Sequence, residues 1–172
     1  MSSAPERIET ERLLLRPFGE FDREPFAAIN ADPEVLRHIG PPLTREQSDA
    51  LLDRIVRSWE QRGFGFYAAE CRKSGDLLGF VGLNVHRFRP DDVEIGWRLG
   101  RTSWGQGLAT EAALAVRDMA FTEMGLPELI SITIAENVRS IRVMQKLGFE
   151  FWMEQQFETV LARIYRLVAP ER

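Results

Sequence analysis

One segment constrains the fold of this chain more than any other: a strand pattern, a glycine-bearing turn and a long helix pattern follow one another. The strand pattern covers residues 93–99, and the turn contains Gly105, Gln106 and Gly107. Such a turn leaves several main-chain N–H groups unpaired where the helix begins, and the helix dipole adds positive potential there. The segment therefore predicts a pyrophosphate cradle built from main chain rather than from side-chain charge.

Two better-known phosphate loops do not fit this turn. A P-loop requires Lys followed by Ser or Thr after its last glycine, whereas Leu108 and Ala109 follow Gly107. A dinucleotide-binding turn requires a further Gly or Ala where Thr110 stands. The remaining pattern is a Gln/Arg-x-x-Gly-x-Gly/Ala turn. The alternative is an ordinary strand-to-helix turn whose glycines serve the backbone shape alone.

A second motif favours the cradle over the ordinary turn. Residues 130–135 alternate as a strand, and a helix pattern follows that starts at Asn137 and ends at Gly148. With both motifs in this order, the chain resembles the GNAT superfamily of acyl-CoA-dependent N-acetyltransferases. Within it, the chain looks closest to the branch of the ribosomal-protein N-terminal (Rim-type) acetyltransferases. Segments 8–17 and 78–83 are similar to the first and third strands of that branch, so the resemblance runs from about Glu9 to Val168.

The resemblance implies that acetyl-CoA is the cosubstrate and that no metal is used. It implies that the cofactor strand separates from the next strand, which frees main-chain groups for the pantetheine amides. It also puts the pantetheine arm near Asn137 and the adenosine-phosphate end near Arg142. A helix N-cap is the alternative role for Asn137, and a solvated arginine is the alternative for Arg142. The residues expected to bind acetyl-CoA are Trp97, Arg98, Leu99, Gly105, Gln106, Gly107, Leu108, Ala109, Thr110, Asn137 and Arg142.

The chemistry expected from the resemblance is direct attack of a neutral amine on the thioester, followed by protonation of the departing thiolate. Many family members place a Tyr four residues after a helix serine to supply that proton, but Met144 stands there in this chain. Ser140 is therefore the candidate acid, as a hydroxyl or as an anchor for a water. Its alternative role is that of a first-turn serine capping the backbone.

Glu94 is the candidate base, because it begins the cofactor strand. Strand alternation puts Glu94, Gly96 and Arg98 on one face, but the sequence does not show which face meets the acceptor. A buried ion pair between Glu94 and Arg98 is the alternative. His86 and Glu158 are two further candidates for acid–base work, each with a surface role as its alternative.

Composition excludes several other classes of function. A formal net charge of −4 does not suit a nucleic-acid-binding protein, and no apolar run approaches the length of a membrane span. The lone Cys71 cannot form an internal disulfide, and the N-terminus lacks a signal-peptide hydrophobic region, so we expect a cytoplasmic protein. The mildly acidic charge is compatible with cationic acceptors, amines among them. Whether the chain forms a homodimer is left open.

The length and the 44% of hydrophobic residues suit one domain over residues 1–172. The expected class is α/β, or α+β by looser usage: a mixed, mostly antiparallel sheet, splayed at the cofactor strand, with helices on both faces. Strands are expected at 12–16, 64–71, 77–88, 93–99, 130–135, 149–156 and 159–168, and helices at 25–31, 33–38, 44–63, 108–125 and 137–148. The buried face of the fourth helix is expected to consist of Leu108, Ala112, Ala115, Val116 and Met119.

The expected function is transfer of an acetyl group from acetyl-CoA to a primary amine, either a protein N-terminal α-amine or a small-molecule amine. An α-amine with a pKa of roughly 7.7–8.0 costs only about 1 kcal/mol to deprotonate at neutral pH, whereas a lysine side chain near 10.4 costs about 4.6 kcal/mol. A site without an evident strong base therefore favours an N-terminal α-amine or a small amine of lowered pKa as the acceptor. The alternatives are a non-catalytic acyl-CoA-binding module and a simple nucleotide-binding domain, and the absent P-loop lysine counts against the latter.

Overall fold

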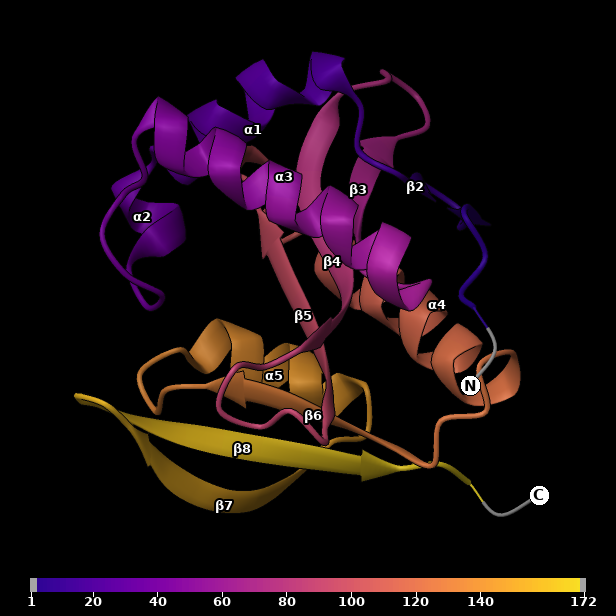
Figure 1. Ribbon diagram of the computed structural model, residues 1–172, viewed down its shortest axis with the longest axis vertical. Helices are drawn as coiled ribbons and strands as arrows, with labels where there is room; N and C mark the ends of the chain where they lie inside the picture. The colour runs from indigo at the N-terminus through magenta and orange to yellow at the C-terminus, as the bar shows by residue number, and fades with distance from the viewer. Residues whose placement is uncertain (1–2, 171–172) are drawn as a thin grey trace.

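One mixed sheet organises the protein in the computed structural model, which describes residues 3–170 (Figure 1). Its eight strands lie in the order β1-β2-β3-β4-β5-β6-β8-β7. Neighbouring strands are antiparallel except β5 and β6, which are parallel, and the sheet does not close on itself. The strands are β1 (Ile8–Glu9), β2 (Leu13–Arg16), β3 (Phe66–Cys71), β4 (Leu77–Val85), β5 (Val93–Leu99), β6 (Glu128–Thr133), β7 (Glu150–Phe157) and β8 (Val160–Val168).

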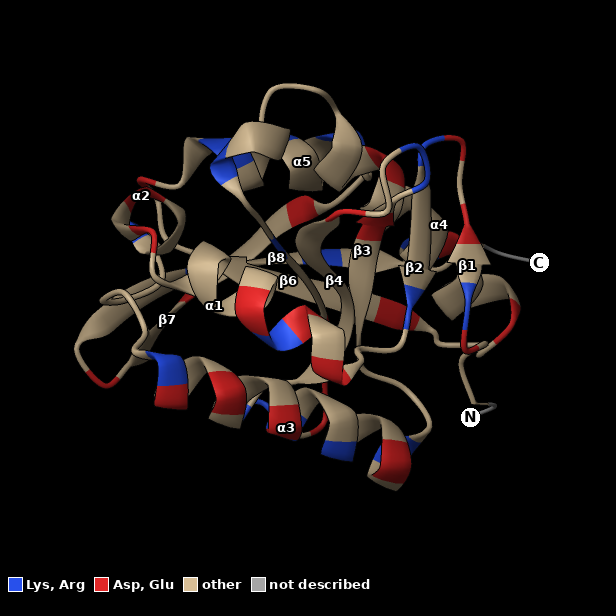
Figure 2. Ribbon diagram, turned by 90° about the horizontal axis from the view of Figure 1, so that it is seen from above, with Lys and Arg blue, Asp and Glu red and all other residues tan. Residues whose placement is uncertain are grey.

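The helices lie on both faces of this sheet, as the sequence predicts (Figure 1). They are α1 (Arg23–Asn30), α2 (Pro33–Leu36), α3 (Arg45–Arg62), α4 (Leu108–Thr122) and α5 (Val138–Lys146), with two 3-10 turns at Glu20–Asp22 and Arg101–Ser103. The residues at the two ends of α3 explain why the sequence predicts this helix. Thr44 and Gln47 form a capping box at its start, and Gly63 ends it with a φ of 71°. Acidic and basic positions share the outer side of α3 (Figure 2).

Two hydrophobic clusters cover the two faces of the sheet. The larger cluster lies between the sheet and α4, and its members include Tyr67, Val81, Ile95, Ala112 and Val116. The smaller one lies under α1 and α3 and consists of the buried residues Phe26, Leu52, Ile55 and Phe80. Since side chains alternate along a strand, β5 directs Ile95 and Leu99 into the larger cluster. Its other face, with Glu94, Gly96 and Arg98, points away from that cluster.

The sheet divides between β5 and β6. The two strands pair in register only at Glu94 and Ile130, whereas β5 stays paired with β4 all the way to Leu99. One side-chain bond reinforces the short junction, because Ser131 Oγ donates to the carbonyl oxygen of Ile95 at 3.0 Å. Strand β6 continues along β8 instead, and the β6, β8 and β7 group runs across the direction of β5 (Figure 1). The predicted splay of the cofactor strand is therefore present.

Several element bounds differ from the sequence expectations by a few residues; β6, for example, covers Glu128–Thr133 rather than 130–135. Segment 8–17, similar to one first strand of the family, forms two short strands here, β1 and β2, which pair antiparallel. The strand expected at 77–88 stops at Val85, and the chain turns before Pro90. On α4 the buried positions include Ala113, while Ala115 is only partly buried, so the packed face is rotated by a fraction of a turn.

A buried ion network fixes the end of β2 against the start of α1. The guanidinium of Arg16 is 7% exposed and donates two bonds to Asp22, at 2.7 and 2.9 Å, and one to Glu70 at 2.6 Å. Asp22 is 1% exposed and also accepts from the main-chain N–H of Gly19 at 2.8 Å. Hydrogen bonding to Asp22 raises the pKa of Arg16 against the opposing effect of burial. The charges of Arg16 and Asp22 are stable in the interior only while they are paired, because both residues are buried and water cannot replace either partner.

We expect Asp22→Asn to lower the free energy of unfolding by about 3 kcal/mol or more, because it leaves part of the Arg16 charge buried without its partner. For a chain of this length, that corresponds to a fall in Tm of roughly 6 °C or more, measurable by thermal denaturation. The matched control is Glu24→Gln, which removes an exposed partner of Arg45 and should cost less than about 1 kcal/mol. Equal losses in the two variants would contradict a structural role for the buried network.

Candidate active site

A cavity of about 750 Å³ opens where the end of β5 meets the first turn of α4 and the start of α5. Of the residues expected to bind acetyl-CoA, all but Gln106 line it: Trp97, Arg98, Leu99, Gly105, Gly107, Leu108, Ala109, Thr110, Asn137 and Arg142. The side chain of Gln106 turns back, and its Nε2 donates to the carbonyl oxygen of Thr102 at 2.8 Å. The structure thus brings together residues from two motifs that are thirty positions apart in the sequence.

The glycine turn has the backbone shape that a main-chain anion site requires. Gly105 and Gly107 have φ values of 74° and 77°, in the left-handed region that disfavours other residues. Gly107 is the N-cap of α4 and has no side chain to occupy the N–H groups of the first turn. Those groups lie at the positive end of the helix dipole and border the cavity, which suits a diphosphate.

Hydrogen bonds from the segment before β2 stabilise this turn. Glu111, in the first turn of α4, accepts bonds from Thr10 Oγ1 at 2.6 Å and from Arg12 Nε at 2.6 Å. Arg12 Nη1 also donates to the carbonyl oxygen of Gln106 at 2.9 Å. The network ties the segment before β2 to the glycine turn and fixes the orientation of one of its peptide groups. Sequence reasoning missed it, because about a hundred positions separate the partners.

The carbonyl oxygen of Leu99 already has a partner within the protein, since Trp104 Nε1 donates to it at 2.8 Å. On the opposite wall of the cavity, the guanidinium of Arg139 lies 4.4 Å from the centre of the Trp104 ring. The sequence indicated one arginine for the phosphate end of the cofactor, but the cavity is lined by four basic residues besides Arg98: Arg37, Arg139, Arg142 and Lys146. Basic positions on α5 are visible in Figure 2.

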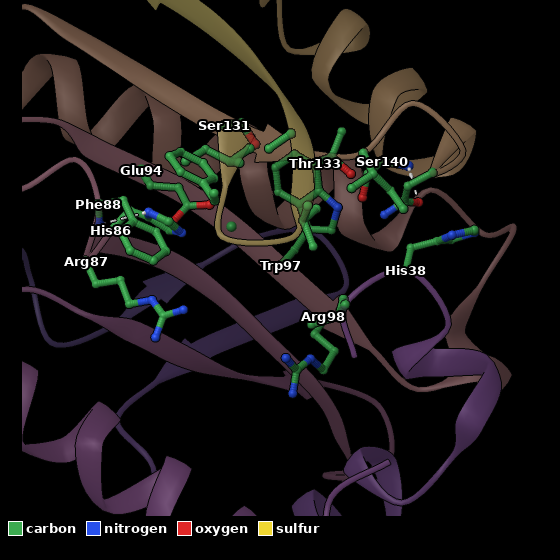
Figure 3. A pocket seen from close by; sticks show the side chains of 18 of the residues that line it. His38, His86, Arg87, Phe88, Glu94, Trp97, Arg98, Ser131, Thr133 and Ser140 are labelled. Atoms are coloured by element: carbon green, nitrogen blue, oxygen red, sulfur yellow. Dashed lines mark hydrogen bonds between the residues drawn. The ribbon is translucent and has the colours of Figure 1, made fainter. Parts of the chain in front are cut away.

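A second cavity, of about 490 Å³, adjoins the first beside β5, and Figure 3 shows side chains that line it. Glu94, Gly96 and Arg98 line it, so the face of β5 that carries these three residues is the face that borders this cavity. Aromatic residues form much of the remaining wall: Phe66, Phe80, His86, Phe88 and Phe157. Six residues border both cavities: His38, Ile39, Trp97, Arg98, Asn137 and Ser140. The two spaces therefore meet beside the splayed end of β5, as a site for two substrates requires.

Glu94 has the titration behaviour of a base that works near neutral pH. Burial raises its pKa to about 7, and the hydrogen bonds that it accepts from the Asn84 side chain and the Ile132 N–H offset only part of this effect. The ion pair with Arg98 that the sequence left open is not formed. Arg98 Nη1 donates instead to Asn30 Oδ1 at 2.6 Å.

Asn137 caps α5, because its Oδ1 accepts from the main-chain N–H of Ser140 at 3.3 Å. Asn137 therefore has the alternative role of a helix N-cap, and it also borders both cavities. Ser140 borders both cavities as well. Met144, at the position where the resemblance led us to look for a tyrosine, is 1% exposed and lies against the second cavity. Its thioether cannot donate a proton.

The two remaining acid–base candidates, His86 and Glu158, also line the second cavity. Figure 3 shows His86 beside Glu94 and Phe88, away from Ser140. Burial, with Arg87 and Arg89 nearby, lowers the pKa of His86 below its ordinary value. Glu158 is exposed and accepts a bond from Arg87 Nη2 at 3.0 Å, so it forms a surface ion pair.

Sequence reasoning missed Ser131, Thr133 and His38 as residues that line this cavity. The first two were detectable as polar positions alternating along a strand beside the cofactor strand. His38 carries no such signal. Within residues 3–170, no group of three or more His, Cys, Asp or Glu side chains is arranged to hold a metal ion. Over the same range, none of the helices has the length and apolar character that crossing a bilayer requires.

Comparison with known proteins gives this arrangement its context. The model of the acetyltransferase (GNAT) domain matches residues 12–150. The FsC-acetyl coenzyme A-N(2)-transacetylase of Aspergillus fumigatus is 32% identical over 151 residues, which cover 82% of this chain and 63% of that protein. The crystal structure of an acetyltransferase from Agrobacterium tumefaciens has a TM-score of 0.85 at 27% identity, with 97% of this chain and 96% of that chain covered.

The fold is also shared with a RimL ribosomal α-N-protein acetyltransferase that was solved with coenzyme A. The TM-score is 0.81 and the coverage is 95% of this chain and 98% of that chain, but the identity is 14%. This likeness shows the fold alone and does not establish the Rim-type branch. The relatives do not favour a non-catalytic acyl-CoA-binding module. Because the family model covers most of the chain and spans both motifs, this chain belongs to the GNAT family, and with N-acetyltransferases among its relatives it is an acetyl-CoA-dependent N-acetyltransferase.

Proposed function

We propose that the protein transfers an acetyl group from acetyl-CoA to a primary amine, which is a peptide N-terminal α-amine or a small-molecule amine. The observation that carries this proposal is the meeting of the two cavities beside Trp97 and Ser140, with Glu94 in the second cavity. The larger cavity takes acetyl-CoA, with its diphosphate on the glycine turn and its pantetheine arm along the end of β5. The smaller cavity takes the acceptor.

Glu94 acts as the general base in this proposal. A carboxylate with a pKa of about 7 is a much better proton acceptor than an ordinary glutamate, and it still exists largely in its ionised form above that pH. At neutral pH an α-ammonium group with a pKa of roughly 7.7–8.0 loses its proton at a cost of about 1 kcal/mol, against about 4.6 kcal/mol for a lysine side chain. The pKa of Glu94 lies close to that of an α-ammonium group, and this supports an acceptor amine of low pKa.

The neutral amine attacks the thioester carbonyl carbon, and the carbon–sulfur bond breaks to release the thiolate of coenzyme A. Ser140 is the proposed proton donor to that thiolate, either directly or through a water that its hydroxyl holds. A thiolate with a pKa of about 8.5 is already a fair leaving group, so a weak donor is sufficient. Since Asn137 bonds the main-chain N–H of Ser140 and not its hydroxyl, the cap leaves that hydroxyl available.

The cradle is tested by Gly107→Val, which puts a β-branched side chain at a φ of 77° and forces the turn to change shape. A Cβ there has room, since its nearest neighbour is Arg12 Nη2 at 3.7 Å, so the backbone conformation is the cause of the effect. We expect the Kd for acetyl-CoA to rise by roughly tenfold or more, as for the loss of one charge-assisted hydrogen bond. Isothermal titration calorimetry measures this change.

Gly75→Val is the matched control for this experiment. Gly75 has a φ of 78° in the turn between β3 and β4, a Cβ there meets nothing within 4 Å, and the residue lines neither cavity. Both variants should lose similar stability, whereas only the first should lose affinity. The cradle would be misplaced if the two variants bound acetyl-CoA equally well.

Glu94→Gln tests the base. In the parent protein at saturating acceptor, kcat should rise with pH through about 7 and then level off, because only the carboxylate accepts the proton. The variant should lose this dependence, and its kcat should fall by roughly 100-fold or more. Rate measurements between pH 5.5 and pH 9 would argue against Glu94 if both proteins gave the same profile.

Thermal stability provides the control for Glu94→Gln, and its sign follows from the raised pKa. A carboxyl group whose pKa is raised by folding binds more protons in the folded state, so its favourable contribution is present at low pH and is lost as pH rises through about 7. The variant should therefore gain Tm relative to the parent between pH 5 and pH 8. A loss of activity without a loss of Tm at pH 8 excludes unfolding as its cause.

Ser140→Ala should lower kcat by roughly 10- to 100-fold, a general-acid effect reduced by the quality of the leaving group. Adding Met144→Tyr to this variant should restore part of the loss, because a phenol then borders the second cavity where many relatives carry one. Steady-state release of free thiol measures both effects. Unchanged turnover in Ser140→Ala would remove the serine from the mechanism and leave solvent as the proton source.

A further inference from the structure

Arg98 carries a positive charge into the second cavity without a carboxylate to balance it. Its Nη1 donates to the neutral amide of Asn30 at 2.6 Å, and its guanidinium carbon lies 5.2 Å from the centre of the Phe80 ring. Its Nε is buried and has no hydrogen-bond partner within residues 3–170. Burial is the sole cause that lowers the pKa of Arg98, to about 10, so no neighbouring anion compensates it. An arginine in this state is unusual, because buried charges are normally paired.

The other ionisable groups of this cavity do not supply the missing negative charge. Arg87 and Glu158 neutralise each other in their ion pair. Glu94, with a pKa of about 7, carries only part of a charge at neutral pH. His86, with its pKa lowered by burial, is uncharged there. The charge of Arg98 therefore stays unbalanced within the cavity.

We propose that the Arg98 guanidinium binds a carboxylate of the acceptor, so that the acceptor is an amine with a carboxylate a few bonds away. This inference rests on the proposed function, since it assigns an acceptor class to the same site. Free amino acids and peptides with an acidic side chain beside the N-terminus share this chemistry. A guanidinium suits it, because its planar array of donors matches the two oxygens of a carboxylate. A polyamine would instead bring further cations against Arg98.

The geometry of β5 fits such an acceptor. Glu94 and Arg98 lie on the same face of the strand, four residues or about 13 Å apart along it, and Gly96 lies between them without a side chain. Figure 3 shows the Arg98 side chain extending away from Ser131, Thr133 and Ser140, on the opposite side of the cavity. A carboxylate held there leaves the amine over the middle of the strand. In that position it lies between the Glu94 base and the junction with the cofactor cavity.

The test compares acceptors that differ only in the carboxylate, with release of free coenzyme A thiol as the readout. One pair is L-phenylalanine and 2-phenylethylamine. The other is a C-terminally amidated tripeptide whose second residue is aspartate and the same peptide with asparagine, and spermidine represents the polyamines. In at least one pair, kcat/KM should be about 10- to 100-fold higher for the member with the carboxylate, the size expected for a hydrogen-bonded charge pair. The pair that shows the effect identifies the source of the carboxylate.

Arg98→Gln should remove this preference, because it raises KM for the carboxylate-bearing acceptor more than KM for its neutral counterpart, so that the ratio of the two kcat/KM values falls to about one. Arg98→Lys keeps the charge but loses the planar donor array, so it should retain part of the preference. Arg87→Gln is the matched control: it changes a paired arginine of the same cavity and should leave the preference unchanged. Thermal denaturation verifies that each variant is folded, and Arg98→Lys carries the test if Arg98→Gln does not fold.

Three results would overturn the proposal. In the first, the neutral acceptors of both pairs, or spermidine, are used as well as the carboxylate-bearing acceptors. Arg98→Gln could lower kcat/KM equally for both members of a pair, which would assign Arg98 to the cofactor or to the fold. Finally, none of these amines could accelerate thiol release from a protein that binds acetyl-CoA. Only this last result would also reject the proposed amine acetylation, so the two failures are distinguishable.

Discussion

The short contact between β5 and β6 is the constraint on which the rest of the site depends. Two parallel strands that pair only at Glu94 and Ile130 must diverge, and the sheet continues because β8 takes over the other edge of β6. Divergence leaves the end of β5 without a partner on one side, and unpaired main-chain groups require a ligand or water. The same divergence leaves space at the end of β5, where the two cavities meet beside Trp97 and Arg98.

This opening carries a cost in stability that other parts of the structure offset. A carboxyl group held beside the junction with a pKa near 7 is destabilising above that pH, and two glycines in the left-handed region hold the turn in a shape that few residues tolerate. The regions behind these features are firmly connected. Glu111 binds the segment before β2 and the glycine turn together through Arg12, and Arg16 does the same for β2 and α1. Rigid support of this kind keeps a reactive site in position.

The sequence predicted those parts of the molecule that local pattern controls. The alternation of 93–99, the glycines of the turn and the capping box at Thr44 all depend on near neighbours, and each is present. The contacts of Glu111 with Arg12 and of Arg98 with Asn30 could not be predicted, because they join residues 99 and 68 positions apart. The face of β5 that meets the second cavity was also undetermined. Alternation defines two faces but does not say what covers each.

Net charge shows a further limit of reasoning from composition. The chain has a formal charge of −4, which is compatible with cationic acceptors, yet the second cavity contains an arginine, Arg98, without a carboxylate partner. The overall charge acts at long range, where salt screens it within about 10 Å at 0.1 M ionic strength. An acceptor inside the cavity instead meets the groups that line it, in a medium that screens them far less. Selectivity is therefore decided by the local balance among Glu94, Arg98 and their neighbours, while the acidic surface acts on the approach of the substrate.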